Sequence, residues 1–244
     1  MEIREALPRV RERVEKAAAS AGRNVDEITL MGVSKFHNVK AVEEAYENGI
    51  RVFGESRVQE ALDKFPAFLS SRPDASLHMI GSLQRNKAKA AAGLFHCVQS
   101  LDRDELVEAL GRACQMERGG EAGGSGEAGE KKAPLLVLLE LHTAEDSKSG
   151  YPGLDALLGG AEKIAAYPGL ELAGLMTMAP FSSDTKAVRA SFRSLYKAGE
   201  ELTRRGFFTA PVLSMGMSGD FEIAIEEGST LIRIGTLIFG ERGL

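Results

Sequence analysis

Short runs of apolar residues recur along the whole chain and are separated by segments that mix apolar and charged residues. Runs of this length, bounded by turn residues, are typical of strands that are buried on both faces of a parallel sheet. The most hydrophobic run reads LLVLLEL. About eight such runs are present, and they cover residues 28–34, 50–54, 77–81, 95–99, 135–141, 172–176, 212–215 and 231–234.

The segments between these runs carry apolar residues at the spacing of amphipathic helices. In NVKAVEEAYEN, for example, Val39, Val42 and Tyr46 fall on one helical face. A similar amphipathic segment of about 20 residues precedes the first apolar run. The other predicted helices cover residues 38–48, 56–69, 86–92, 102–116, 153–167, 183–205 and 219–227.

A strand followed by a helix, repeated eight times, is the pattern of a (β/α)₈ TIM barrel. An open doubly wound sheet is the alternative, but the chain has no early glycine-rich dinucleotide-binding turn. We therefore predict a single barrel domain over residues 1–244, with the first helix plugging or flanking the bottom of the barrel. Residues 117–132 (ERGGEAGGSGEAGEKK) contain no large apolar residue, and we expect them to form a flexible insertion in a loop opposite the active-site face.

Composition narrows the class of protein. The chain has 30 Lys and Arg against 35 Asp and Glu, a formal net charge of −5, which argues against a nucleic-acid-binding surface. Cys97 and Cys114 lack metal-site spacing and are expected to be free thiols in a reducing cytoplasm. No apolar stretch approaches the roughly 20 residues of a membrane span. The N-terminal segment is too charged for a signal peptide, and the four histidines are scattered, so we predict no metal site.

Lys35 directly follows the first predicted strand. An amine beside an apolar wall loses part of its preference for the charged form and becomes a better nucleophile. Such a lysine is suited to form a Schiff base with an aldehyde. The alternative is a lysine at a strand end whose stem lies on apolar surface while its amine reaches water.

The loops after the last two predicted strands suggest an anion site. TIM barrels often bind phosphate there, where glycines let backbone N–H groups approach the anion. Gly216 and Gly235 supply the glycines, and Ser214 and Thr236 add hydroxyl groups. A phosphate site together with a reactive lysine indicates a phosphorylated aldehyde. Pyridoxal 5′-phosphate (PLP) fits this description, and so does the substrate of a sugar-phosphate aldolase.

Arg233 helps to choose between them. Alternation along the last strand places Arg233 on the same face as Gly235, towards the barrel interior. Cofactor enzymes often place a charged group at the pyridine nitrogen, and an arginine there would keep that nitrogen unprotonated. The alternative is an internal ion pair, for instance with Glu55.

Five strings of the sequence resemble the pyridoxal phosphate homeostasis protein family, in the order in which that family carries them. They are SKFHNVKAVEEAYENGIRVFGESRVQEALDK, HMIGSLQRNKAK, DSKSG, GLMTMAP and LSMGMSGDFEIAIEEGSTLIRIGTLIFG. The resemblance runs from about Met31 to Arg242 and excludes only the glycine-rich segment. The long C-terminal string is the most specific part.

The resemblance implies a barrel like the N-terminal domain of alanine racemases (PLP fold type III). It implies that PLP is held as an imine on Lys35, and it implies further cofactor contacts. These are a phosphate contact from Ser214, phosphate contacts from the backbone of Gly235 and Thr236, Arg233 near the pyridine nitrogen, and Asn86, Met215 and Gly216 at the cofactor's edge. One departure is Ser56, where the family usually has Asn, so a hydrogen bond made there would be lost or relayed by water.

The resemblance further implies a cytoplasmic, non-enzymatic protein that buffers PLP or delivers it, with PLP-dependent apoenzymes as possible partners. The alternative is a PLP-dependent amino-acid racemase, which needs a second proton carrier. In alanine racemases a second domain supplies that group as a tyrosine, and this chain ends soon after the eighth strand. Tyr151 is the one tyrosine suited to the role, since the other three lie in predicted helices. Without the second domain, we expect a monomer.

Overall fold

Eight parallel strands close into a barrel in the computed structural model, which describes residues 2–118, 133–143 and 149–241. Each strand pairs with the next, and β8 pairs back with β1. The predicted (β/α)₈ barrel is therefore confirmed. The strands are β1 Thr29–Val33, β2 Val52–Glu55, β3 Ser76–Met79, β4 Cys97–Leu101, β5 Leu135–Glu140, β6 Leu170–Met176, β7 Val212–Ser214 and β8 Leu231–Ile234.

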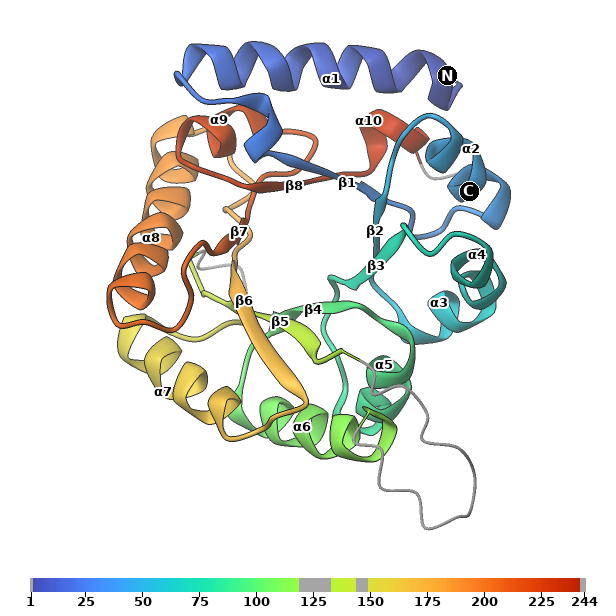
Figure 1. Ribbon diagram of the computed structural model, residues 1–244. Helices are drawn as coiled ribbons and strands as arrows, with labels where there is room; N and C mark the ends of the chain where they lie inside the picture. The colour runs from blue at the N-terminus through green and yellow to red at the C-terminus, as the bar shows by residue number, and fades with distance from the viewer. Residues whose placement is uncertain (1, 119–132, 144–148, 242–244) are drawn as a thin grey trace.

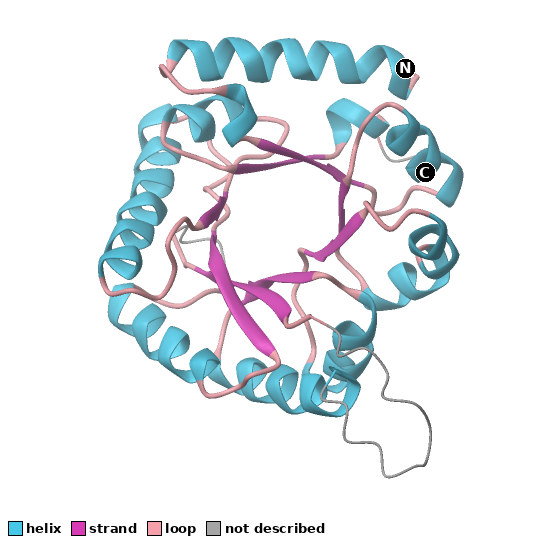
Figure 2. Ribbon diagram, in the orientation of Figure 1, coloured by secondary structure: helices cyan, strands magenta, loops and turns pink. Residues whose placement is uncertain are grey.

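The helices surround the barrel (Figures 1 and 2). They are α1 Ile3–Ser20, α2 Val39–Glu47, α3 Val58–Lys64, α4 Pro66–Ser71, α5 Ala88–Leu94, α6 Asp104–Arg118, α7 Leu154–Ala165, α8 Thr185–Arg204, α9 Phe221–Glu226 and α10 Thr236–Phe239. Two short 3₁₀ helices, η1 Val25–Glu27 and η2 Arg85–Lys87, complete the set of helices in the described ranges.

The sequence predicted one helix over residues 56–69, and the structure has two. α3 ends at Lys64 and α4 begins at Pro66. Proline has no N–H with which to continue α3, whereas its fixed φ suits the first turn of a new helix. Of the predicted glycine-rich insertion, residues 117 and 118 close α6, and residues 119–132 lie outside the described residues.

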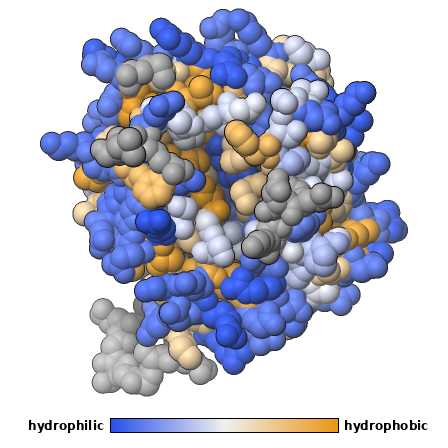
Figure 3. Space-filling model, turned by 180° about the vertical axis from the view of Figure 1, so that it is seen from behind, coloured by the Kyte–Doolittle hydropathy of each residue, from blue (hydrophilic) through white to orange (hydrophobic). Residues whose placement is uncertain are grey.

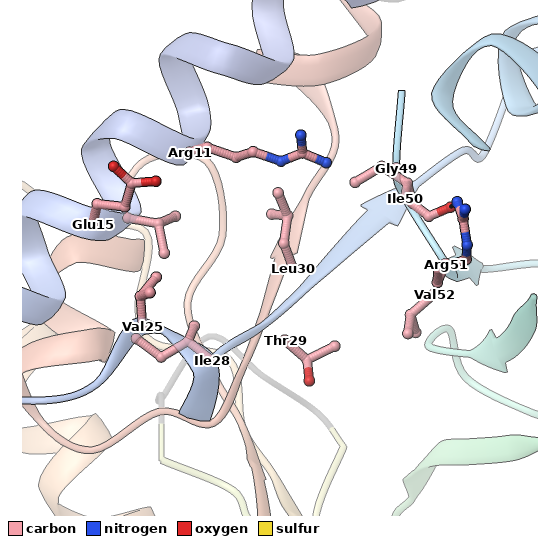
Figure 4. A pocket seen from close by; sticks show the side chains of 11 residues that line it. Arg11, Glu15, Val25, Ile28, Thr29, Leu30, Gly49, Ile50, Arg51 and Val52 are labelled. Atoms are coloured by element: carbon pink, nitrogen blue, oxygen red, sulfur yellow. Dashed lines mark hydrogen bonds between the residues drawn. The ribbon is translucent and has the colours of Figure 1, made fainter. Parts of the chain in front are cut away.

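Helix α1 flanks the barrel, as the sequence allowed. Its apolar face buries Leu7, Val10 and Val14, and the helix packs against α9 and α10 (Figure 1). Where α1 passes the starts of β1 and β2, side chains that include Arg11 and Glu15 line a cavity of about 320 Å³ (Figure 4). This cavity lies at the opposite end of β1 from Lys35.

The main core lies between the strands and the outer helices. The barrel interior holds two smaller apolar clusters, one around Met31, Val33 and Leu231 and the other around Cys97, Leu138 and Met176. The interior also contains buried polar side chains, and these form the candidate site. They include Gln99, Ser214 and Arg233, each at most 4% exposed.

Candidate functional site

Lys35 lies in a tight turn directly after β1. The turn is closed by a hydrogen bond from the His37 N–H to the Ser34 carbonyl, 3.0 Å long. Its third residue, Phe36, has φ +68°, the only positive φ of a non-glycine residue in the described ranges. A left-handed conformation costs such a residue about 1–3 kcal/mol and persists only where the surroundings impose it. The half-buried Lys35 is thus presented by a strained turn.

Two side chains of α3, Glu60 and Lys64, contact the turn and impose that conformation. The Phe36 N–H donates to Glu60 Oε1 at 2.6 Å, and Lys64 Nζ donates to the Ser34 carbonyl at 2.9 Å. Lys64 also donates to Glu60 Oε1 at 3.0 Å and to Glu55 Oε1 at 2.7 Å. We call Glu55, Glu60 and Lys64 the turn anchor. The side chain of Lys64 is only 7% exposed and that of Glu55 is fully buried, so the ion pair between them is largely shielded from water.

Glu55 is fully buried and receives a second hydrogen bond, from Ser34 Oγ at 2.7 Å. Burial raises the pKa of Glu55, and the neighbouring Lys64 opposes that shift. Its Oε2 atom is the one buried side-chain polar atom of the described residues without a hydrogen-bond partner. The sequence left open an ion pair between Glu55 and Arg233; the structure instead pairs Glu55 with Lys64.

Arg233 points into the barrel, as alternation along the strand predicted. Its Nη1 donates to Ser214 Oγ at 2.7 Å, and its Nη2 donates to the Thr177 carbonyl at 2.9 Å. Burial lowers the pKa of Arg233 to about 10, against the opposing effect of Asp220 and Glu140. Arg233 therefore stays charged at neutral pH, and its two recorded bonds leave other N–H groups of the guanidinium for a ligand.

A chain of hydrogen bonds continues from Arg233 across the barrel. Ser214 Oγ donates to Gln99 Oε1 at 2.7 Å, and Gln99 Nε2 lies 2.9 Å from His78 Nδ1. His78 Nε2 lies 3.0 Å from Ser76 Oγ. In this arrangement the Ser214 hydroxyl gives its single proton to Gln99, so that proton is not free for the phosphate contact expected from the sequence.

The two glycine turns meet beside Arg233. Gly216 has φ +94°, which suits glycine, and its carbonyl accepts the Arg233 N–H at 2.9 Å. Gly235 precedes α10, whose first residue is Thr236. The first N–H groups of a helix have no partner inside it. Backbone N–H groups that point out of such turns can bind an anion.

The strand register brings Lys35 to the same end of the barrel. In the pairing of β1 with β8, Met31 lies opposite Arg233 and Gly32 lies opposite Ile234. A Cβ on Gly235 would lie 3.4 Å from the Val33 carbonyl oxygen, and Lys35 follows Val33 by two residues. The His37 ring also stacks on Phe239 of α10, with 5.2 Å between centroids. Lys35, Gly235 and Arg233 thus occupy adjacent strand ends; a hollow bordered by hydrophobic side chains is visible near the middle of Figure 3.

Two predicted cofactor residues lie apart from this group. The side chain of Met215 is buried in the main core, outside the barrel wall, so only its backbone can face a ligand. Asn86 is exposed in η2 and lines a separate cavity with α6 side chains that include Glu105 and Arg112. Ser56 is half-buried directly after β2, where its backbone leaves no room for a Cβ on Gly81.

Sequence reasoning allowed an ion pair at Glu55 but missed its partner Lys64 and also Glu60. It also missed the residues that extend the hydrogen-bond chain. Gln99 and His78 did carry a signal, since each is a polar residue in a run predicted as a buried strand. Lys64 carried none, because a charged residue within a predicted amphipathic helix is ordinarily solvated.

The tyrosine considered as a second proton carrier is engaged elsewhere. The Tyr151 hydroxyl donates to Asp104 Oδ1 at 2.9 Å, and the ring packs against α7 in the main core. Burial and the Asp104 carboxylate raise its pKa. A hydroxyl in this setting is poorly suited to exchange protons near neutral pH.

Two further observations concern only the described residues. They contain no group of three or more His, Cys, Asp or Glu side chains that could hold a metal ion. None of their helices combines the length and the apolar composition needed to cross a membrane.

Comparison with known proteins gives a class of protein that agrees with the barrel fold. The alanine racemase N-terminal domain family matches residues 6–243. An alanine racemase from Clostridium difficile superposes with a TM-score of 0.73 over 98% of this chain and 56% of that one, at 11% identity, which supports the fold alone.

Closer relatives define the particular family. A pyridoxal phosphate homeostasis protein from Aquifex aeolicus is 37% identical over 238 residues, which cover 98% of this chain and 97% of that protein. The structure of PipY from Synechococcus elongatus with PLP bound has a TM-score of 0.79 and 31% identity, over 98% of this chain and all of that one. The chain belongs to the pyridoxal phosphate homeostasis protein family.

Proposed function

We propose that this chain binds PLP covalently through Lys35 and holds it as a carrier in PLP homeostasis, without catalytic turnover. The observation that carries the proposal is that residues with three kinds of donor group lie at adjacent strand ends. These are Lys35 with its side-chain amine, Gly235 and Thr236 with their backbone N–H groups, and Arg233 with its guanidinium.

The donor set fits PLP. When bound, PLP supplies an aldehyde that condenses reversibly with a primary amine, together with a phosphate and a pyridine nitrogen. Lys35 would supply the amine, and the N–H groups at the start of α10 would hold the phosphate. Arg233 would donate to the ring nitrogen. The stack of His37 on Phe239 joins the Lys35 turn to α10, so the amine and the phosphate donors are held relative to each other.

Two features support a carrier rather than an enzyme. Arg233 is charged and can only donate, so it disfavours a protonated ring nitrogen and weakens the ring as an electron acceptor. Tyr151 is hydrogen-bonded to Asp104 and buried in the main core, and so is not poised as a second base. A racemase would exchange the Cα hydrogen of an amino acid in D₂O. Sustained exchange with L- or D-alanine would contradict the carrier function.

The attachment site is tested by reduction with borohydride, followed by peptide mapping. We expect the PLP-loaded protein to lose its visible absorption band and to gain one pyridoxyl group, on Lys35. Lys35→Ala should show neither change while keeping its far-UV circular dichroism. Lys64 is the second amine beside the turn, and label on its peptide in the wild-type protein would overturn the assignment.

The role of Arg233 is tested by spectroscopy. Arg233→Ala should still be labelled on Lys35 but should show a shifted absorption band, because the ring nitrogen loses its donor. An unchanged spectrum would place Arg233 away from the ring.

The remaining proposals concern context. We propose a cytoplasmic monomer that passes PLP to PLP-dependent apoenzymes. Neither Cys97 nor Cys114 forms a disulfide and both are buried, which supports a reducing compartment. Light scattering on the purified protein tests whether it is a monomer. Reactivation of a PLP-free transaminase by the PLP-loaded protein tests whether PLP is delivered. If the loaded protein releases PLP no faster in the presence of the apoenzyme than in its absence, the protein buffers PLP and does not deliver it directly.

A further inference from the structure

The hydrogen-bond chain that crosses the barrel contains residues to which the proposed function gives no role. It joins four strands, β8, β7, β4 and β3, through side chains that all point into the interior. Its members in order are Arg233, Ser214, Gln99, His78 and Ser76. We call this set the interior chain.

The donors of the interior chain all point the same way. Arginine can only donate, so Ser214 Oγ accepts from it and must give its single proton to Gln99 Oε1. The amide group of Gln99 then faces His78 Nδ1, which must accept. His78 is therefore a neutral imidazole with its proton on Nε2, and it donates to Ser76. Burial, with a smaller effect of His96, lowers the pKa of His78 to about 3, which agrees with a neutral ring.

The opposite orientation of the Gln99 amide would reverse every donor beyond Arg233. Gln99 Nε2 would then donate to Ser214, and Gln99 Oε1 would accept from a proton on His78 Nδ1. The proton of Ser214 would become free to bind a phosphate. The two arrangements thus differ in one measurable property, the tautomer of His78.

We propose that Gln99 and His78 are positioning residues that hold the Ser214 hydroxyl with its proton turned towards Gln99 and its lone pairs towards Arg233. In this arrangement Ser214 is the acceptor that fixes the guanidinium. The Ser214 hydroxyl then has no proton left for the phosphate of PLP. The link of this inference to PLP rests on the proposed function. The proton arrangement of the interior chain does not depend on PLP.

The proton arrangement is tested first on the protein without PLP, by ¹⁵N NMR of the imidazole rings. The His78 signals are assigned by their loss in His78→Asn. We expect a neutral ring with the proton on Nε2 throughout pH 5–8. A proton on Nδ1, or titration of His78 within that range, would overturn the inference.

The link to the cofactor is tested with interior variants of the PLP-loaded protein. Gln99→Leu breaks the chain, and Ser214→Ala removes the acceptor for Arg233. Both should shift the absorption band in the same direction, and the double variant should shift it no further than the larger single shift, because one chain is broken in each case. Ser214→Thr keeps the hydroxyl and should restore the wild-type band.

Cys97→Val is the matched control, since Cys97 also points into the barrel from β4 but does not belong to the interior chain. It should leave the band unchanged. Additive shifts, or a Gln99→Leu spectrum identical to that of wild type, would overturn the positioning role. Melting curves identify a variant that fails to fold, and Gln99→Asn is then the milder substitute, with a partial shift expected. If wild-type protein shows no band that borohydride removes, the proposed function fails, while the NMR result still decides the proton arrangement.

Discussion

The turn anchor and the interior chain solve the same problem in different ways. Both hold a nitrogen group at the carboxyl ends of the strands, but the turn anchor lies outside the barrel wall and the interior chain lies within it. The turn anchor uses full charges, with Lys64 bonded to two carboxylates. The interior chain has a single charge, on Arg233, and its other members are neutral.

The difference follows from what each group must do. The strained turn at Phe36 needs strong local interactions to persist, and charge-assisted hydrogen bonds provide them. In the proposed function the charge of Arg233 is directed at PLP, and a carboxylate bonded to Arg233 would neutralise that charge. Neutral acceptors such as Ser214 Oγ and the Thr177 carbonyl orient the guanidinium without doing so.

The largest expected effect comes from breaking the turn anchor. Lys64→Met leaves Glu55 buried without its cation, and removing one partner of a buried pair typically costs about 3–5 kcal/mol of stability. We expect a loss of this size in urea unfolding, together with weaker covalent loading of PLP on Lys35. Lys16→Met is the control, because Lys16 and Glu12 form an exposed pair on α1; it should leave the midpoint unchanged. Equal losses of stability in Lys64→Met and Lys16→Met would mean that the turn anchor does not stabilise the fold.

Acid should act on the interior chain through His78. The unfolded chain binds a proton on this histidine near pH 6.5, whereas the folded chain does so only at about pH 3. Between these values the unfolded state holds more protons, so stability is lost as the pH falls below 6.5. The loss attributable to His78 between pH 7 and pH 5 is about 2 kcal/mol.

Comparing wild type with His78→Asn isolates this contribution. We expect the difference in unfolding free energy between the two proteins to narrow as the pH falls from 7 to 5, because only the wild type has the histidine that takes up a proton on unfolding. A difference that stays constant with pH would show that His78 is not held neutral. His142→Asn serves as a control at a half-buried histidine outside the interior chain.

The smallest expected effect is a gain. Asparagine tolerates left-handed backbone better than phenylalanine does, and Phe36 is 46% exposed, so little buried surface is lost. Phe36→Asn should therefore raise the unfolding free energy by about 0.5–1 kcal/mol. Phe36→Ala keeps the unfavourable conformation and should give no gain. A loss of stability in Phe36→Asn would mean that the contact of Arg57 with the Phe36 ring outweighs the strain.

The sequence predicted the strands more closely than the helices. All eight apolar runs contain strand residues, and the last matches β8 at both ends. The helix over residues 56–69 was not resolved into α3 and α4, because amphipathic spacing continues across Pro66 although the backbone ladder does not. The glycine after the last apolar run and the alternation of side chains along β8 also predicted that Gly235 and Arg233 lie at the barrel mouth.

The sequence itself determined the fold and the residues that stand at the carboxyl ends of the strands, because strand periodicity, turn glycines and a lysine after an apolar run are local properties. The tertiary structure decided the hydrogen-bond partners. Lys64 with Glu55, and Gln99 with Ser214, join residues of different elements, and the latter two are 115 positions apart. Such pairs depend on barrel closure and strand register, and no local pattern of residue types records which buried donor will face which acceptor.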